Sequence, residues 1–247
     1  MSQAWRWVRS AVYVGQVYVM MGVIGIVFFP FALVSRDAAR AACKAFCRWT
    51  LWTARWMVGL RTEVRGPVPT GEVLIASKHQ SFLDIIMIFN AVPAGKFIMK
   101  RELLWAPVLG QYALRIGCVP VDRGKRGQAI TKMVKDVEAG SAQAGQLIIY
   151  PQGTRVPPGV HKPYKVGSAV LYDQLGQDCV PAATNVGLFW PKKGILRKPG
   201  LAVVEFLPSI AAGTDQRTFL TRLEREVERA SNALMAEAGF KVPPPHN

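Results

Sequence analysis

The stretch Val73-Leu-Ile-Ala-Ser-Lys-His-Gln-Ser-Phe-Leu-Asp-Ile-Ile-Met-Ile-Phe89 predicts a buried strand, a turn and a helix in succession. Residues 73–77 form a short apolar run typical of a buried strand, and residues 82–89 are apolar and compatible with a helix. On one continuous helix His79 and Asp84 would point roughly 140° apart, because five residues turn the chain by about 500°. The two side chains can therefore meet only if the chain bends between them, at a strand-to-helix turn.

Such a turn could hold an imidazole base against a carboxylate. Asp84, in the first helical turn, could accept a hydrogen bond from one imidazole nitrogen of His79 and leave the other free as a base. Taken alone, His79 could equally be a structural residue that caps the helix. Ser81 raises the alternative of a serine nucleophile, but two residues is a poor separation for a Ser–His pair and the sequence has no Gly-x-Ser-x-Gly turn. We expect the Ser81 hydroxyl to help cap the helix.

Around this stretch, short β-like runs alternate with helix-like runs. This alternation predicts an α/β layered domain, with a mainly β central sheet flanked by helices. The predicted strands are 73–77, 96–99, 117–121, 146–150, 179–184 and 201–206, and the predicted helices are 82–91, 126–139, 165–175 and 215–238. In the last helix, apolar residues at a spacing of three and four form one face, which we expect to pack on the sheet.

The N-terminal segment is long and apolar. No charged residue lies between Arg9 and Arg36, and the apolar core from Val12 to Val34 is long enough to span a bilayer. A cleaved signal peptide would have a shorter apolar region, of about 7–15 residues, and a small-x-small site that is not evident here. A buried helix of a globular protein is the other alternative. We expect membrane insertion, either spanning or re-entrant.

The next segment carries two stripes at helical spacing. The basic stripe is Arg36, Arg40, Lys44 and Arg48, and the aromatic stripe is Phe46, Trp49, Trp52 and Trp56. A helix with such faces suits the lipid headgroup layer, although the same periodicity fits an amphipathic helix packed on the rest of the protein. The turn-rich break at residues 66–71 follows. We therefore predict that residues 1–65 form a membrane-inserted helix plus an amphipathic helix, and that residues 66–247 form the domain that carries the chemistry.

Composition narrows the class of partner. The chain has 31 Lys and Arg against 16 Asp and Glu, a net charge of +15, so it should favour anionic surfaces. Half of its residues are hydrophobic, which points to a membrane rather than to nucleic acid, and no nucleic-acid-binding motif is present. The spacing of Cys43, Cys47, Cys118 and Cys179 matches no metal-binding pattern, so we expect no metal site and reduced thiols in a cytoplasmic environment.

Four short blocks stand near predicted strand ends, where open α/β sheets tend to place their sites. They are His79 to Asp84, Lys100-Arg-Glu-Leu103, Tyr150-Pro-Gln-Gly-Thr-Arg155 and Val180-Pro181. In this order they resemble the glycerolipid acyltransferase family, specifically the 1-acylglycerol-3-phosphate acyltransferases. That family carries His-x4-Asp, Lys-x-Glu-Leu, Phe-Pro-Glu-Gly-Thr-Arg and Val/Ile-Pro. The resemblance covers roughly residues 70–190, and four ordered blocks behind an apolar N-terminus are a specific signal.

The resemblance implies an O-acyltransferase of phospholipid biosynthesis. Such an enzyme moves an acyl chain from acyl-carrier protein or acyl-coenzyme A to the sn-2 hydroxyl of lysophosphatidic acid, giving phosphatidic acid. His79 would be the general base and Asp84 would orient it. An alcohol has a pKa far above 7 and needs a positioned base, which is typically worth ~10²–10⁴-fold in rate. A thioester is acylating without a metal, so the resemblance implies no cofactor.

The same resemblance implies a phosphate-binding site. The planar guanidinium of Arg155 and the compact charge of Lys100 fit phosphate oxygens, although either could also be a solvated surface charge. Gly153 would let the backbone approach a ligand closely. The substrate-binding residues that the resemblance implies are Lys100, Arg101, Gln152, Gly153, Thr154 and Arg155.

One departure from the family pattern affects the acceptor. The family usually has Glu where this chain has Gln152, which keeps the size but loses the charge. We hypothesise that Gln152 tunes acceptor recognition, so glycerol 3-phosphate or a lyso-aminolipid such as lyso-ornithine lipid are alternative acceptors. A non-catalytic lipid-binding protein with a decayed site is the alternative from another class, but His79, Asp84 and Arg155 are intact.

The charge pattern also predicts a location. Arg6 and Arg9 precede the apolar segment, and the larger basic cluster that starts at Arg36 follows it. Positive charges prefer the cytoplasmic side of a membrane. We therefore expect a bacterial-type inner-membrane protein whose catalytic domain faces the cytoplasm and contacts an anionic lipid surface.

Overall fold

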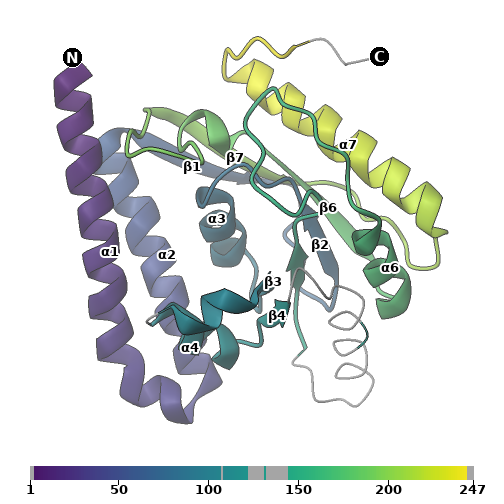
Figure 1. The fold of residues 1–247 in the computed structure, drawn as a ribbon, viewed down its shortest axis with the longest axis horizontal. Coiled ribbons are helices and arrows are strands. Elements are labelled where there is room, and N and C mark those ends of the chain that lie inside the picture. The colour runs from purple at the N-terminus through teal and green to yellow at the C-terminus, as the bar shows by residue number, and fades with distance from the viewer. Residues whose placement is uncertain (1–2, 107, 122–130, 132–143, 244–247) are drawn as a thin grey trace.

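The computed structural model describes residues 3–106, 108–121, 131 and 144–243. Its strands are β1 (Leu60–Arg65), β2 (Leu74–Ser77), β3 (Lys96–Lys100), β4 (Val119–Val121), β5 (Leu147–Ile149), β6 (Cys179–Thr184) and β7 (Gly200–Phe206). Within these residues they form a seven-stranded sheet in the order β1-β7-β6-β2-β5-β3-β4 (Figure 1). Neighbouring strands are parallel except for the antiparallel pair β6 and β7.

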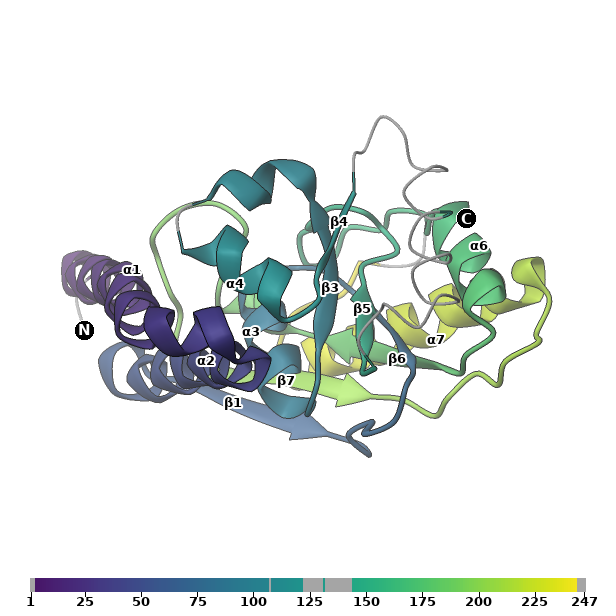
Figure 2. The same ribbon diagram turned by 90° about the horizontal axis from the view of Figure 1, so that it is seen from below.

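Helices cover both faces of this sheet. They are α1 (Gln3–Val34), α2 (Arg36–Val58), α3 (Leu83–Ala91), α4 (Leu109–Arg115), α6 (Val166–Leu175) and α7 (Gln216–Glu237), with 3₁₀ helices η1 (Arg101–Trp105) and η2 (Val186–Leu188). Helices α1 to α4 lie on one side of the sheet and α6 and α7 on the other (Figures 1 and 2). The predicted α/β class is therefore confirmed.

The alternation of side chains along the strands creates two cores. In β2, Ile75 points into the core shared with α1 to α3, whereas Leu74 and Ala76 point into the core shared with α6 and α7. Successive side chains of a strand face opposite sides of the sheet, and here both sides are covered. For this reason the central strands read as continuous apolar runs, and all six predicted strands are present.

One strand, one α-helix and the two 3₁₀ helices were not predicted from the sequence, and one predicted helix lies outside the described residues. Strand β1 pairs with β7 at the edge of the sheet and alternates charged with less polar residues, so it lacks the continuous apolar run of the central strands. Helix α4 is only 7 residues long, too short for a periodic signal. The helix predicted at 126–139 lies outside the described residues, apart from residue 131. Because β1 belongs to the sheet, the sheet begins before the predicted boundary at residue 65, and the division into two domains stays a prediction.

Helices α1 and α2 form a hairpin joined at Ser35. The Ser35 hydroxyl accepts a hydrogen bond from the Ala38 backbone N–H and caps α2. The Tyr13 hydroxyl donates to the Thr50 carbonyl oxygen at 3.1 Å, which fastens α1 along α2. Because the other side of α2 packs on the domain, α2 lies between α1 and the sheet (Figure 2).

The two stripes of α2 are divided between different environments. Lys44 Nζ donates to the Val92 carbonyl oxygen at 2.8 Å, so this member of the basic stripe faces the domain. Trp49 donates to the side chain of Gln16 on α1, whereas Trp52 and Trp56 are exposed. Residues 36–58 are thus helical as predicted, but only part of each stripe is available to a surface.

Candidate active site and exposed apolar surface

His79 and Asp84 meet across a bend between β2 and α3. His79 Nδ1 lies 2.9 Å from Asp84 Oδ1. The other carboxylate oxygen, Oδ2, accepts from the backbone N–H groups of Gln80 and Ser81, each at 2.8 Å. The Ser81 hydroxyl accepts from the backbone N–H of Leu83, the first residue of α3, at 3.1 Å, which confirms its expected capping role.

This arrangement fixes the tautomer of the imidazole. A carboxylate that already takes two backbone N–H donors can only accept from Nδ1, so Nδ1 carries the proton. Nε2 has no hydrogen bond to any described residue, which leaves its lone pair available. The Asp84 side chain is 0% exposed and that of His79 is 14% exposed, so the carboxylate is enclosed while the imidazole keeps an open edge.

Tyr150 packs against the imidazole. It follows β5, the neighbour of β2, and its ring stacks on His79 with centroids 3.9 Å apart and an angle of 21° between the planes. Burial, and then the charge of Asp84, raise the pKa of Tyr150 well above its usual value, so the phenol stays neutral. Tyr150 stands where the resembled family usually has Phe, and nothing in the third block shows which ring it contacts.

The turn after Tyr150 joins the third block to the first. The Val156 backbone N–H donates to the His79 carbonyl oxygen at 2.7 Å. Gly153 has φ +67°, a conformation that favours glycine, and a Cβ there would lie 2.6 Å from Lys165 Nζ. Gln152 is buried and its amide oxygen has no hydrogen-bond partner among the described residues. Thr154 and Arg155 follow directly, next to the His79 turn.

A lysine from a distant segment reaches this turn. Lys192 lies between η2 and β7, and its Nζ donates to the Arg155 carbonyl oxygen at 2.9 Å and lies 3.5 Å from Thr154 Oγ1. The ammonium adds positive charge beside Arg155. Sequence analysis missed Lys192, and the only signal was a Lys-Lys pair that matches no motif.

The second block reaches the same edge of the sheet by topology. Strands β2, β5 and β3 are parallel neighbours, so their carboxyl ends lie on one side (Figure 2). Two of these ends precede His79 and Tyr150, and Lys100 is the last residue of β3. Lys100 and Arg101 are exposed and make no hydrogen bond or ion pair to another described residue. The fourth block differs, because Val180 and Pro181 lie inside β6 and are buried beside β2.

A largely buried ion pair lies between the His79 turn and α7. The Lys78 side chain is 1% exposed and its ammonium pairs with the Glu228 carboxylate on α7. The Tyr164 hydroxyl donates to the other oxygen of Glu228 at 3.3 Å. The turn is therefore tied to α7 as well as to α3. No group of three or more His, Cys, Asp or Glu side chains that could hold a metal ion occurs in the described part of the chain.

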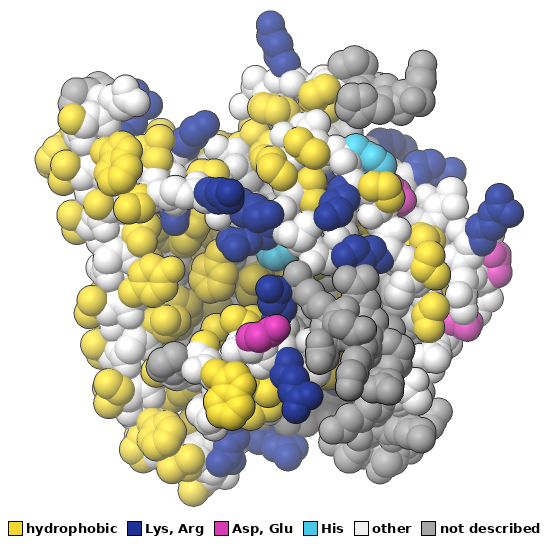
Figure 3. All heavy atoms as spheres, in the orientation of Figure 1, with side chains coloured by type: hydrophobic (Ala, Val, Ile, Leu, Met, Phe, Trp, Pro, Cys, Tyr) yellow, Lys and Arg dark blue, Asp and Glu magenta, His cyan; other side chains and the backbone are white. Residues whose placement is uncertain are grey.

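The outer face of α1 is apolar and exposed. In the described residues α1 is the one helix long and apolar enough to cross a membrane, by length and composition. Hydrophobic side chains gather along it in Figure 3. The exposed large ones are Trp5, Trp7, Val8, Val12, Tyr18, Val19, Val23, Ile26, Val27, Phe29, Phe31, Leu33 and Val34.

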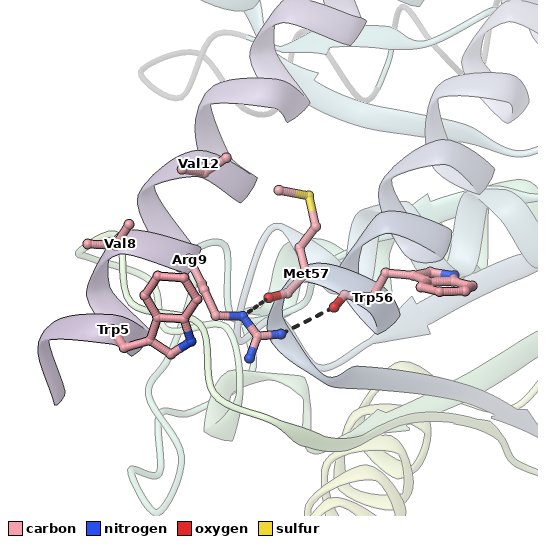
Figure 4. A pocket seen from close by; sticks show the side chains of 6 residues that line it. All are labelled: Trp5, Val8, Arg9, Val12, Trp56 and Met57. Carbon is pink, nitrogen blue, oxygen red and sulfur yellow. Dashed lines mark hydrogen bonds between the residues drawn. The ribbon is translucent and has the colours of Figure 1, made fainter. Parts of the chain in front are cut away.

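At the N-terminal end of α1, Arg9 lies against the end of α2 (Figure 4). Its Nε donates to the Met57 carbonyl oxygen at 2.5 Å and its Nη2 to that of Trp56 at 3.2 Å, so the guanidinium satisfies the last carbonyls of α2. Trp5 and Trp56 flank a hollow of about 290 Å³ there. Tryptophan and arginine at one end of an apolar helix are typical of a membrane–water interface.

Comparisons with known proteins agree with these features. The acyltransferase family model matches residues 61–185, which include all four blocks. The chain is 28% identical over 204 residues to the 1-acyl-sn-glycerol-3-phosphate acyltransferase of Pseudomonas aeruginosa, covering 82% of this chain and 79% of that one. It is 31% identical over 170 residues to 1-acyl-sn-glycerol-3-phosphate acyltransferase alpha of Mus musculus, covering 66% and 60%.

A solved structure shares the fold. The crystal structure of the 1-acyl-sn-glycerophosphate (LPA) acyltransferase PlsC from Thermotoga maritima superposes with a TM-score of 0.76 at 19% identity. The match covers 94% of this chain and 99% of that one, so it includes the N-terminal hairpin as well as the sheet.

Proposed function

The chain belongs to the acyltransferase family, and on that premise we propose that it acylates the sn-2 hydroxyl of lysophosphatidic acid to give phosphatidic acid. The relatives reported above are named for 1-acyl-sn-glycerol-3-phosphate, which is the same acceptor. The observation that carries the proposal is the His79–Asp84 pair, because it presents an unprotonated Nε2 at an open edge. A positioned base is what an alcohol nucleophile requires.

The reaction follows from this geometry. Nε2 of His79 takes the hydroxyl proton as the acceptor oxygen attacks the thioester carbonyl. A new C–O bond forms, the C–S bond breaks, and the departing thiolate takes the proton from the imidazolium. Asp84 stabilises the imidazolium through Nδ1, and Tyr150 keeps one face of the ring dry. The base is expected to contribute ~10²–10⁴-fold to the rate.

The acceptor phosphate would bind between the second and third blocks. Arg155 offers a planar fork, Lys100 a compact charge, and both lie at the carboxyl edge of the same parallel strands. Gly153 and Thr154 form the turn that carries Arg155, and Lys192 adds charge beside it. Arg101 belongs to the second block and Gln152 to the third. The neutral Gln152 would tune which acceptor fits.

The membrane would hold the enzyme through α1. Polar contacts fasten α1 at both ends, because Ser10 bonds the Arg197 backbone and the Tyr112 hydroxyl donates to the Gly25 carbonyl oxygen. Helix α2 carries too many charges to enter hydrocarbon. Helix α1 would therefore immerse its outer face while its inner face stays on the domain. The basic cluster after it favours a cytoplasmic catalytic domain in a bacterial-type inner membrane, with acyl-carrier protein or acyl-coenzyme A arriving from the water.

The test is acyl transfer by purified protein in vesicles, comparing wild type with His79→Ala. The panel crosses lysophosphatidic acid, glycerol 3-phosphate and lyso-ornithine lipid with both thioester donors. His161→Ala is the matched control, because that exposed histidine pairs with Glu224 of α7 and makes no contact with Asp84. We expect transfer to lysophosphatidic acid that His79→Ala abolishes and His161→Ala preserves.

Other outcomes would change the conclusion. Transfer only to another acceptor would leave His79 as the proposed base and would replace lysophosphatidic acid as the proposed acceptor. Transfer that survives His79→Ala at the wild-type rate would contradict the mechanism. No transfer by the folded wild-type protein would favour a non-catalytic lipid-binding role.

A further inference from the structure

The segment formed by η1 and α4 exposes apolar side chains that the proposed chemistry does not use. Trp105 is 87% exposed and Leu114 46%, and no strand or helix of the described residues covers them. Leu103 and Leu109 are also exposed. Four large apolar side chains exposed within twelve residues form an apolar patch of the kind that marks an interaction site.

This patch continues the apolar face of α1. Helix α4 lies beside the C-terminal half of α1 in both views (Figures 1 and 2), and the Tyr112 hydroxyl donates to the Gly25 carbonyl oxygen at 2.7 Å. Between them runs an apolar groove of about 400 Å³. It is lined by Gly25, Ile26, Phe29 and Pro30 of α1 and by Val108, Gln111 and Tyr112.

Basic side chains border the patch. Lys100 and Arg101 stand at the start of η1, separated from Leu103 by the exposed acidic residue Glu102, and Arg115 ends α4. In Figure 3, Lys and Arg side chains, with an acidic side chain among them, lie beside hydrophobic ones over the lower middle of the molecule, where Figure 1 places this segment. Tryptophan prefers the membrane–water interface, and basic residues at its edge gain from anionic lipid headgroups.

We propose that η1 and α4 form a second membrane-docking surface, which inserts beside α1 into an anionic phospholipid layer. Leu103, Trp105 and Leu109 enter the acyl region, and acyl chains of the bilayer fill the groove against α1. Lys100 and Arg101 then lie at headgroup depth. Continuity with α1 and the basic border favour lipid over a second protein chain.

The docking also bears on how the acceptor arrives, a part of the inference that rests on the proposed function. A lysophospholipid keeps its phosphate at headgroup level and its chain in the bilayer. If η1 is at that depth, the acceptor phosphate meets Lys100 without leaving the membrane. The membrane contact itself does not depend on the acceptor.

The first experiment measures depth without using activity. Trp105→Cys is labelled with an environment-sensitive fluorophore and reconstituted into vesicles of phosphatidylcholine and phosphatidylglycerol. Burial raises the pKa of all four native thiols, to about 12 for Cys43, to about 11 for Cys118 and further for Cys47 and Cys179, so they resist labelling. Phe29→Cys on α1 reports a lipid contact, and Val166→Cys, 63% exposed on α6 across the sheet, reports water.

We expect the label at position 105 to shift to the blue and to be quenched by spin-labelled lipid, as at position 29. The label at position 166 should remain quenched by a water-soluble reagent. If position 105 behaves like position 166 while position 29 reports lipid, the proposal is overturned, whatever the enzyme acylates.

The second experiment uses the reaction. Trp105→Asp should raise the apparent KM for a long-chain acceptor in vesicles at least about tenfold, because a charged residue is excluded from the acyl region. Its rate on a short-chain acceptor dissolved as monomers should not change. Val166→Asp is the matched control and should change neither. A loss of Trp105→Asp activity on both acceptors alike would mean a structural role and would overturn the docking.

Discussion

At the scale of single residues, the decisive feature is that Asp84 accepts three hydrogen bonds. Two come from backbone N–H groups, which can only donate, and the third comes from His79 Nδ1. In Asp84→Asn the amide oxygen would stay on the backbone donors and the NH₂ group would face Nδ1. The proton would then move to Nε2, and the base would be lost.

We therefore predict that Asp84→Asn lowers kcat by roughly 10²–10⁴-fold. The measurement is the steady-state rate of acyl transfer in vesicles, and the thermal unfolding midpoint is the control for folding. A variant that unfolds at the wild-type temperature and keeps its rate would show that Asp84 does not orient His79.

Gln152 is the departure from the family pattern that changes a charge. Its amide is buried with an unsatisfied oxygen beside the turn that carries Arg155. In Gln152→Glu a carboxylate would add negative charge near the proposed phosphate site. We predict a change in the ratio of kcat/KM between lysophosphatidic acid and the other acceptors. Unchanged ratios on every acceptor would remove the hypothesis that Gln152 tunes recognition.

Lys192 and Lys193 form a matched pair. Lys192 bonds the backbone of Arg155, whereas Lys193 makes no hydrogen bond or ion pair to another described residue. An exposed charge contact is worth up to about 1 kcal/mol, so Lys192→Ala should raise KM for the phosphorylated acceptor by up to about fivefold. Lys193→Ala should leave KM unchanged. Equal effects of both substitutions would indicate general surface charge rather than a specific contact.

These residues show how far a sequence reading reaches. The His79–Asp84 contact is local, five residues apart across a predictable bend, so spacing alone could predict it. The stacking of Tyr150 on His79 and the hydrogen bond from Lys192 to the Arg155 carbonyl are tertiary contacts between distant segments. No pattern in either segment indicates its partner. In the sequence Lys78 resembles an ordinary surface charge, because its partly buried partner, Glu228, lies 150 residues away.

At the scale of elements, the close approach of α4 to α1 depends on one glycine. A Cβ at Gly25 would overlap the Val108 side chain, whereas a Cβ at Gly22 would meet nothing within 4 Å. Gly25→Ala should therefore destabilise the protein by about 1–3 kcal/mol through overpacking. Gly22→Ala should stabilise it by up to about 1 kcal/mol through helix propensity.

The measurement is thermal unfolding of both variants in the same detergent. Because α4 follows the segment that carries Lys100, Gly25→Ala should also weaken acceptor binding. Identical midpoints for the two variants would mean that α4 does not rest on α1 in solution.

The predictability of the elements follows from their environment. Strands β2, β5 and β6 are covered on both faces, and their continuous apolar runs could be found from sequence. Strand β1 is a one-sided edge strand and gives no such run. In α2 the periodicity predicted the helix, but a stripe on a helix could face either lipid or protein. Only the packing of α1 and α3 against α2 decides which residues of each stripe are covered by protein.

At the scale of the whole molecule, the N-terminal hairpin and the catalytic turn share one core. Tyr13, Ala54, Ile75 and Leu83 belong to a single buried cluster that runs from α1 through α2 to the sheet and α3. The helix that carries Asp84 thus packs on the hairpin whose outer face is apolar and exposed. We infer that attachment to lipid and the geometry of the site are mechanically connected, so removing the hairpin would damage both.

Attachment has two physical components that salt can separate. The net charge of +15 attracts the protein to anionic lipid, and this attraction is screened at high salt, where the Debye length falls to about 3 Å at 1 M. Burial of the exposed α1 side chains in lipid is not screened, and each large side chain contributes about 1.5–3 kcal/mol when fully buried.

We predict that binding to anionic vesicles is stronger than to zwitterionic ones at low salt, and that 1 M salt removes this difference without releasing the protein. Vesicle flotation measures the bound fraction, and added DNA should not compete at physiological salt. Complete release at 1 M salt would leave electrostatics as the whole of the attachment. The apolar face of α1 would then be covered by something other than lipid, and the docking of η1 and α4 beside it would lose its support.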